Sequence, residues 1–387
     1  MSDAEEEEPR PFSLTRGGPF YRLQMRLHLR APNSLRRAWW IAVAAWVPIV
    51  LGAGVRHVLG MPADQTLHDL SIHVRLLVTL PVLLSSEIVL ENSAASAIRS
   101  MYLGHFCDAA KLDGIAERAE WWRDRWWVEA GLLGIAILGG QLAMWGVFGA
   151  GGLFHGSTIV GVWSFPYLWY ACIALPIVQF VMLRWVWRWM IWSYVLVRIS
   201  RLPLTPLATH ADGAAGLEPL ARPVSAFSAF TLAIGAIIAA AWGTTLLHEH
   251  TTIETLLPQL VIFLLDVLAI AVAPLLLFSG HLFRTRRRTL AQYGEFVRNY
   301  TLRFHAKWID PPSPDDPLGS PDIQSLNDLG SAFQVVSKTR PFVFGPRTVF
   351  MVWFAGLIPM VPLFASTVTV ESVLERIVKT VLGGFPF

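Results

Sequence analysis

The sequence is poor in charged residues and in cysteine. Charged side chains make up 15% of its 387 residues, against about a quarter in a soluble globular domain. With 54% hydrophobic residues, so few polar groups cannot cover the surface of a water-soluble fold of this size. Two cysteines, Cys107 and Cys172, are too few for a disulfide scaffold. These shortages exclude a soluble enzyme, a disordered chain and a disulfide-rich domain, and they indicate a polytopic membrane protein.

Lysine and catalytic motifs are also scarce. Only 4 of the 31 basic residues are lysines, an arginine bias typical of a GC-rich bacterial genome. The formal charge of +3 is too small to indicate nucleic acid as a partner. No zinc-protease, Walker or nucleophile-elbow motif is present, so we expect no enzymatic activity, no cofactor and no bound metal. The acidic start MSDAEEEEPR lacks the pattern of a cleaved signal, and the first span is expected to stay as an anchor.

Seven stretches are long and apolar enough to cross a hydrocarbon core, which takes about 20 residues. They cover residues 39–60, 71–91, 126–149, 163–191, 224–247, 256–282 and 348–364. Tryptophans crowd their edges, and we expect these rings to form interfacial belts. The tryptophans in question are Trp39, Trp40, Trp121, Trp122, Trp126, Trp127, Trp185, Trp187, Trp189 and Trp192.

The positions of the basic residues predict the orientation. With the N-terminus inside, 27 of the 31 basic residues fall on the cytoplasmic side, as the positive-inside rule requires. The predicted fold is therefore all-α, a polytopic membrane helix bundle with about seven spans, the N-terminus in and the C-terminus out. The expected location is a bacterial inner membrane.

The chain divides into four expected regions. These are a partly amphipathic cytoplasmic segment (1–37), spans one to six (38–283), a cytoplasmic helical region (284–346), and the seventh span with its tail (347–387). Arginines at every fourth position make the first region either an interfacial helix or a solvated lead-in. Helical periodicity continues from the sixth span, predicting one helix over 256–308, about 80 Å long. The second span likewise continues through NSAASAIRSMYLGHF.

Small residues at four-residue spacing predict helix faces that are buried in the bundle. One such face in the fifth span contains Gly235, Ala239 and Gly243. In the third span the same spacing joins Ala130 to Gly134 and Ala136 to Gly140.

Asp266 is the sharpest functional signal, because it lies near the middle of the sixth span. A carboxylate at that depth costs roughly 2.5–3.5 kcal/mol, so we expect it to face a partner or a water-filled pathway, or to be protonated. It is interpreted either as an ion or proton site or as one half of a structural pair. Pro274, eight residues later, can free backbone carbonyls nearby.

Charges also mark the second and fourth spans. Arg75 lies in the outer half of the second span, and Glu87 and Glu91 share one face at its inner end. These three residues either line an ion pathway with Asp266 or lie at the membrane edges. In the fourth span Arg184 and Arg188 share a face, and we interpret them as inner-interface residues that contact lipid headgroups.

Histidines gather on the predicted outer side. His248 and His250, with His73 on the same side, are candidates for pH or metal sensing, although two histidines alone do not define a metal site. On the cytoplasmic side THADGAAGL brings His210 close to Asp212, and a tight turn is the favoured interpretation there.

The segments THADGAAGL and DIQSLNDLGSAFQVV resemble stretches of uncharacterised bacterial inner-membrane proteins with about seven spans. That resemblance implies a fold but no activity. In layout alone, seven spans and extended cytoplasmic helices resemble the insect chemoreceptor channels. The last span lacks the Tyr and Gln of that family's C-terminal motif, so no residue role is transferred.

The leading hypothesis is a homo-oligomeric ion channel or other ion-translocating protein, with the lipid bilayer and ions as partners. It rests on charges within the spans and on the absence of catalytic motifs and transporter-like repeats. A membrane signalling or scaffold protein with a cytoplasmic binding surface is the first alternative. A membrane enzyme acting on a lipid-linked substrate, through His210 and Asp212 or the outer histidines, is the second.

Overall fold

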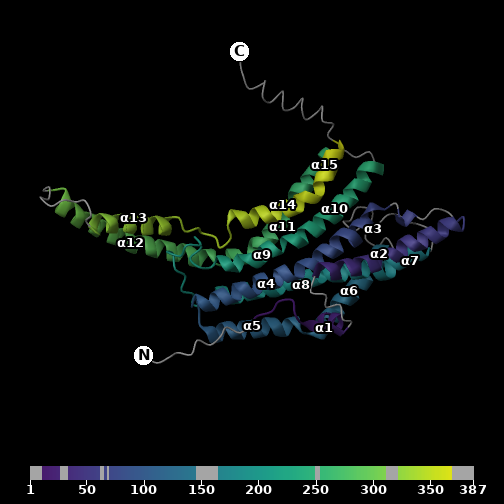
Figure 1. The fold of residues 1–387 in the computed structure, drawn as a ribbon, viewed down its shortest axis with the longest axis horizontal. Helices are drawn as coiled ribbons and strands as arrows, with labels where there is room; N and C mark the ends of the chain where they lie inside the picture. The colour runs from purple at the N-terminus through teal and green to yellow at the C-terminus, as the bar shows by residue number, and fades with distance from the viewer. Residues whose placement is uncertain are drawn as a thin grey trace, which may run out of the picture.

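A computed structural model describes residues 11–26, 34–61, 65–67, 69–144, 164–248, 253–310 and 321–367, which contain helices and no strand (Figure 1). The helices are α1 (Gly18–Arg26), α2 (Ser34–Val58), α3 (Leu70–Val74), α4 (Leu80–Leu103), α5 (Ala109–Arg123), α6 (Trp126–Met144), α7 (Phe165–Trp169), α8 (Leu175–Ser200), α9 (Arg222–Ala226), α10 (Ser228–His248), α11 (Ile253–Leu276), α12 (Ser279–Trp308), α13 (Pro321–Ser337), α14 (Pro346–Leu357) and α15 (Val361–Thr367). Short 3-10 or π turns are η1 (Gln65–Leu67), η2 (Arg75–Thr79), η3 (Tyr170–Ala174), η4 (Glu218–Ala221) and η5 (Ile358–Met360).

Six of these helical segments are long and apolar enough to cross a membrane. They are Leu35–Val58, Leu70–Leu103, Phe165–Ser200, Glu218–Leu246, Thr255–Leu276 and Pro346–Phe364. The all-helical class is thus confirmed for the described residues. The expected third span corresponds to α6, whose apolar part, Trp126–Gly139, is shorter than the other six, and residues 145–149 lie outside the described ranges.

Helices α4 and α8 form the centre of the bundle. Both carry rows of fully buried apolar residues, and α2 packs on α4 while α6 and α5 pack on α8 (Figure 1). Trp185 and Trp192 belong to this core, and the indole nitrogen of Trp185 donates to the carbonyl of Leu83. The expectation that these two rings form an interfacial belt is wrong. Trp40 and Trp126, in contrast, are 61% and 68% exposed, as belt residues should be.

Small residues allow α10 and α14 to pack closely. A Cβ on Gly235 would lie 2.9 Å from the carbonyl oxygen of Gly356, so any side chain there would force the helices apart. The buried small-residue face predicted for the fifth span is therefore confirmed. For the third span the expectation holds only in part: Ala136 is 1% exposed, whereas Ala130 is exposed and a Cβ on Gly134 would meet no atom within 4 Å. The burial of Gly140 lies outside what the structure describes.

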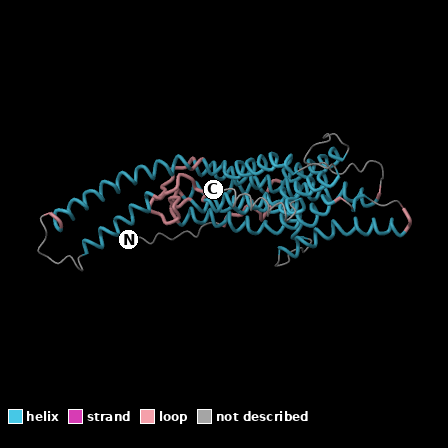
Figure 2. Tube along the Cα trace, turned by 90° about the horizontal axis from the view of Figure 1, so that it is seen from above, coloured by secondary structure: helices cyan, strands magenta, loops and turns pink. Residues whose placement is uncertain are grey.

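Helix α12 and helix α13 form a hairpin that extends beyond one end of the bundle (Figures 1 and 2). The predicted single helix over 256–308 is interrupted, because a turn at Leu277 and Phe278 separates α11 from α12. The fully buried ring of Phe278 joins the core at that turn, which explains the break. The predicted continuation of the second span is confirmed as far as Leu103, since α3, η2 and α4 form one helical segment, Leu70–Leu103. Its last three residues, Gly104 to Phe106, lie outside the helix.

The THADGAAGL segment is a tight turn organised by Asp212, as the sequence predicts. Its carboxylate accepts the backbone N–H groups of Ala214, Gly216 and Glu218 at 2.9, 3.0 and 3.1 Å. Burial raises the pKa of Asp212, but the three N–H bonds and the hydrogen bond from His210 lower it by more. The net result is a pKa below the usual value for aspartate. The turn is also tied to the end of α13, since Arg340 donates to its backbone.

Candidate functional site

A buried group of charges lies where α2, α4, α6 and α8 meet. We name it the inner charge cluster, and it consists of Arg37, Glu87, Glu129, Arg184 and Arg188. Glu87 accepts a hydrogen bond from Arg188 at 2.8 Å and lies 3.5 Å from Arg184 and 3.8 Å from Arg37. Glu87, Arg184 and Arg188 are each less than 9% exposed. At such depth the carboxylate and the guanidinium groups are stable only because they compensate one another.

Glu129 connects this cluster to the N-terminal segment. One of its carboxylate oxygens lies 3.3 Å from Nε of Arg184, and the other accepts the backbone N–H of Phe20 at 2.7 Å. The Phe20 ring lies under the Arg184 guanidinium, 4.5 Å from its carbon, and contacts Phe180 edge to face. The N-terminal segment thus packs against the inner charge cluster through Phe20.

Carboxylates on α4 and α6, and Asp124 between α5 and α6, hold residues 14–20. Glu91 accepts hydrogen bonds from the backbone N–H groups of Leu14 and Thr15 and from the Thr15 hydroxyl, at 2.7–3.0 Å. Asp124 accepts the N–H of Gly18, the first residue of α1, at 2.9 Å. The Gly18 bond, like that of Phe20 to Glu129, satisfies a backbone donor that the start of α1 leaves unpaired. Burial raises the pKa of Asp124, but Arg123 and the Gly18 N–H lower it below its usual value.

Two pairs of like charges at four-residue spacing explain how the inner charge cluster forms. Glu87 and Glu91 lie four residues apart on α4, and Arg184 and Arg188 lie four residues apart on α8, so each pair projects from one face. The structure turns these faces toward each other. Arg184 and Arg188 are therefore buried ion-pair partners, whereas the sequence favoured contact with lipid headgroups.

A second polar contact joins the two π turns that directly precede α4 and α8. Nη1 of Arg75, the first residue of η2, donates to the hydroxyl of Tyr170, the first residue of η3, at 2.6 Å. Each π turn is followed by a Leu-Pro pair that ends in Pro81 or Pro176, and proline lacks the N–H of a regular helix. Local π geometry often marks functional or strained positions. Arg75 is 5% exposed, and its Nη2 has no hydrogen-bond partner among the described residues.

Asp266 is placed differently from all of these residues. It lies on an exposed face of α11, between Ile262 and Ile270, which are 58% and 57% exposed. It makes no hydrogen bond or ion pair with any residue that the structure describes. The four residues expected to line one pathway are thus not gathered: Glu87 and Glu91 share one buried region, whereas Arg75 and Asp266 lie elsewhere.

The histidines expected to sense pH or bind metal are only partly described. His73 accepts a hydrogen bond from the Trp46 indole at 2.9 Å and lies 2.9 Å from the Leu67 carbonyl, which assigns the ring proton to Nε2. The His248 side chain and all of His250 lie outside the described residues. In the described ranges, no three His, Cys, Asp or Glu side chains are grouped as metal ligands.

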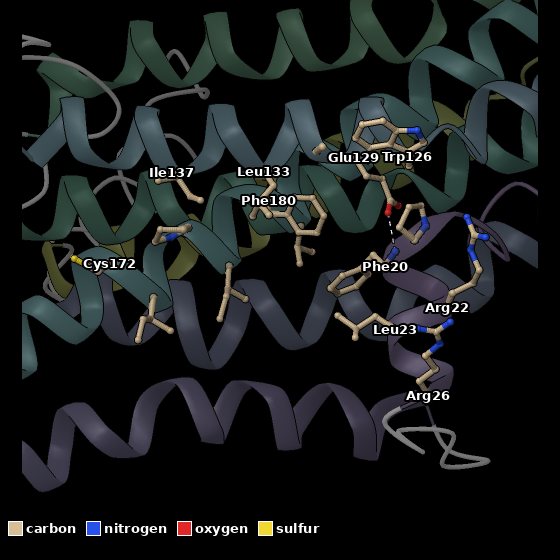
Figure 3. Close-up of a pocket in the computed structure, with 16 residues that line it drawn as sticks. Phe20, Arg22, Leu23, Arg26, Trp126, Glu129, Leu133, Ile137, Cys172 and Phe180 are labelled. Carbon is tan, nitrogen blue, oxygen red and sulfur yellow. Dashed lines mark hydrogen bonds between the residues drawn. The ribbon is translucent and has the colours of Figure 1, made fainter.

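A pocket of about 810 Å³ adjoins the inner charge cluster between α1, α6 and α8 (Figure 3). Its long wall is apolar, with Leu133, Ile137 and Phe180 among the side chains that face it. Arg22 lies at the end of the pocket near Phe20, where Glu129 binds the Phe20 backbone. The pocket has the chemistry to hold an apolar chain with an anionic group at one end.

Sequence reasoning missed Glu129, Tyr170 and the residues of 13–20. Glu129 had a signal, since it is the single carboxylate of the expected third span. Tyr170 lies six residues before a proline, as does Arg75, but this shared spacing becomes informative only once the two helices are known to be neighbours.

Comparisons with protein-family models, curated proteins and solved structures find no match to the chain. The functional inference therefore rests on the chain's own geometry.

Proposed function

We propose that the chain is a multi-pass protein of a bacterial inner membrane, with seven spans, a cytoplasmic N-terminus and an external C-terminus. The six long apolar segments support this proposal, and α6 supplies the seventh span. With 19 residues, α6 is about 28 Å long, close to the thickness of a hydrocarbon core. The distribution of basic residues supports the orientation.

Within that membrane, we propose that the protein conducts cations as a homo-oligomer. The observation that carries this proposal is the exposed carboxylate of Asp266 on an apolar helix face. Only 17% of the apolar window of Thr255–Leu276 is buried, against 61% for Glu218–Leu246. A helix that is so exposed, with a carboxylate at its middle, is suited to line a water-filled path between copies of the chain.

The symmetry of a homo-oligomer would bring several Asp266 carboxylates together around one path. Copies related by a rotation axis repeat the same residue around that axis, and a ring of carboxylates attracts and selects cations. Glu87, Glu91 and Arg75 have a different role in this proposal. Because they are bound within the chain, they hold the helices and the N-terminal segment in the conformation that presents α11.

Flux through proteoliposomes tests the proposal. Vesicles with the wild-type protein are expected to take up K⁺ or Na⁺ at least tenfold faster than empty vesicles, and Asp266→Asn should abolish most of that excess. Asp310→Asn, a matched change of an exposed residue at the end of α12, should leave it unchanged. Absence of flux, flux of anions alone, or an Asp266→Asn variant that conducts normally would each overturn the proposal.

The projecting hairpin favours a second candidate function, a signalling or scaffold role. Its helices α12 and α13 expose Phe296, Leu302 and Ile323 at 61%, 57% and 44% beyond the end of the bundle (Figures 1 and 2). Exposed apolar residues of this kind are suited to a protein partner. A soluble protein that co-purifies with the wild type and is lost in Phe296→Ser/Leu302→Ser would support this role, and unchanged flux in that variant would separate it from conduction.

A further inference from the structure

A hollow of about 540 Å³ lies between α5 and α8, away from the inner charge cluster. We name it the basic hollow. Its basic lining residues are Lys111 and Arg118, one on each side of Gly114 on α5, and Arg198 and Arg201 at the end of α8. On each helix these positions recur at three, four or seven residues, so they project from one face. A Cβ on Gly114 would meet no atom within 4 Å, so this glycine leaves the hollow open.

The cations of the basic hollow have little compensation within the chain. The side chains of Arg118, Arg198 and Arg201 make no ion pair or hydrogen bond with any described residue. Lys111 lies 3.8 Å from Asp108, an exposed neighbour on its own helix. No carboxylate lines the hollow itself. Four like charges repel one another unless an anion joins them, so the hollow is electrostatically complementary to a multiply charged anion.

The position of the hollow along α8 decides which anion reaches it. The predicted fourth span ends at Ile191. Arg198 lies seven residues beyond Ile191, or roughly 10 Å further along the helix axis. The headgroup layer extends only about 5–8 Å past the hydrocarbon. The hollow therefore faces the aqueous phase beyond the lipid phosphates.

We infer that the basic hollow binds a soluble ligand through a di- or triphosphate group. Arginine matches phosphate oxygens with paired N–H donors, and Lys111 adds a compact charge. A volume of 540 Å³ is within the range of small-molecule sites and leaves room for more than the phosphates. The half-buried ring of Tyr194 also lines the hollow and can lie against an attached group. This inference uses the proposed membrane position but not the proposed conduction.

Calorimetry tests the inference. It measures the binding of inorganic pyrophosphate and of tripolyphosphate to the full-length protein in a neutral detergent. The wild type is expected to bind both, more weakly as salt is raised, because the contacts are ionic. Arg198→Gln/Arg201→Gln should weaken binding at least tenfold. Arg284→Gln/Arg287→Gln, which removes two exposed charges at the same spacing on α12, should not. Gly114→Trp keeps every charge but fills the hollow, and it should also abolish binding.

Further arms identify the source of the anion. Anionic lipid added to the micelles should not displace pyrophosphate, and displacement that depends on Arg198 and Arg201 would overturn the assignment to a soluble ligand. Replacing the acidic run at residues 5–8 by glutamine should leave the affinity unchanged. Binding that appears only in that variant would mean that the chain's own glutamates occupy the hollow, and it would also overturn the inference. Because these experiments measure binding and not flux, a failure to bind pyrophosphate would leave the proposed conduction standing. Likewise, a failure to conduct would leave the proposed phosphate site standing.

Discussion

Glu87 and Asp266 are both carboxylates in apolar helices, and their surroundings are opposite. Glu87 is 8% exposed and lies within 3.8 Å of three guanidinium groups. Asp266 is exposed and has no ion-pair partner among the described residues. The cost of placing a charge in an apolar environment is thus offset inside the chain at Glu87, whereas no described residue offsets it at Asp266.

The difference separates residues whose charges are paired within the fold from a residue that, in the proposed function, faces a water path between copies of the chain. A buried ion pair contributes little compared with apolar side chains of the same size, but removing one partner leaves the others uncompensated. A carboxylate with no partner leaves nothing uncompensated when it is neutralised. Substitutions that keep shape but remove charge therefore distinguish the two roles, and their effects on stability should differ by several kcal/mol.

The largest effect is expected for Glu87→Gln. The change leaves Arg184 and Arg188 buried without their shared carboxylate and should cost about 3–5 kcal/mol of unfolding free energy. Equilibrium unfolding of the purified protein measures this loss. Glu295→Gln, at an exposed position on α12, is the matched control and should change little.

A double variant makes that prediction specific to the ion pair. Adding Arg188→Met to Glu87→Gln removes one of the uncompensated cations and should restore part of the lost stability. A double variant that is as unstable as the sum of the two single changes would show that Glu87 acts through packing alone. If Glu87→Gln leaves the unfolding free energy unchanged, Glu87 does not stabilise the fold through its charge, and it cannot be distinguished from Asp266 in this way.

Glu91→Gln should have the next largest effect, about 1–3 kcal/mol, and it should be local. The neutral amide weakens the charge-assisted bonds from Leu14, Thr15 and the Thr15 hydroxyl. Hydrogen exchange at Leu14 and Thr15 should accelerate more than exchange in the centre of α8. Equal acceleration throughout the bundle would contradict a role confined to the N-terminal segment.

The helix faces of these clusters were predictable, but their pairing was not. Four-residue spacing put Glu87 with Glu91 and Arg184 with Arg188, because helical periodicity is a local property. Which face meets which depends on contacts about 100 residues apart, and no local pattern encodes these. For the same reason Arg184 was expected at the lipid headgroups, the common position of an arginine near a span's end.

Other differences also come from tertiary packing. The turn between α11 and α12 follows from the burial of Phe278, a residue whose flanking sequence is helical in pattern. Trp185 and Trp192 are core residues because the face of α8 that carries them is buried in the bundle, whereas tryptophan on a lipid-facing side of a helix favours the interface. The turn at Asp212 was predictable, since an aspartate followed by small residues forms its bonds locally.

Asp212→Asn should cost about 1–2 kcal/mol near pH 7, because the carboxylate accepts three backbone N–H bonds. The pKa of Asp212 in the fold lies below its ordinary value of 3.8, so the carboxylate stabilises the fold above that pH. The contribution is lost as pH falls from 3.8 through the folded pKa. Melting curves should show the two proteins converging below about pH 4. A constant difference down to pH 2 would exclude the carboxylate as its cause.

The smallest effect on stability is expected for Asp266→Asn. Because no described residue pairs with this carboxylate, its neutralisation should change the unfolding free energy of the monomer by less than about 0.5 kcal/mol. The measurement is the one used for Glu87→Gln, on protein held monomeric by excess detergent. A loss of 3 kcal/mol or more would reveal a partner within the chain and place Asp266 with Glu87. An unchanged stability together with lost cation flux would assign Asp266 to the conduction path, since a purely structural residue cannot give that combination.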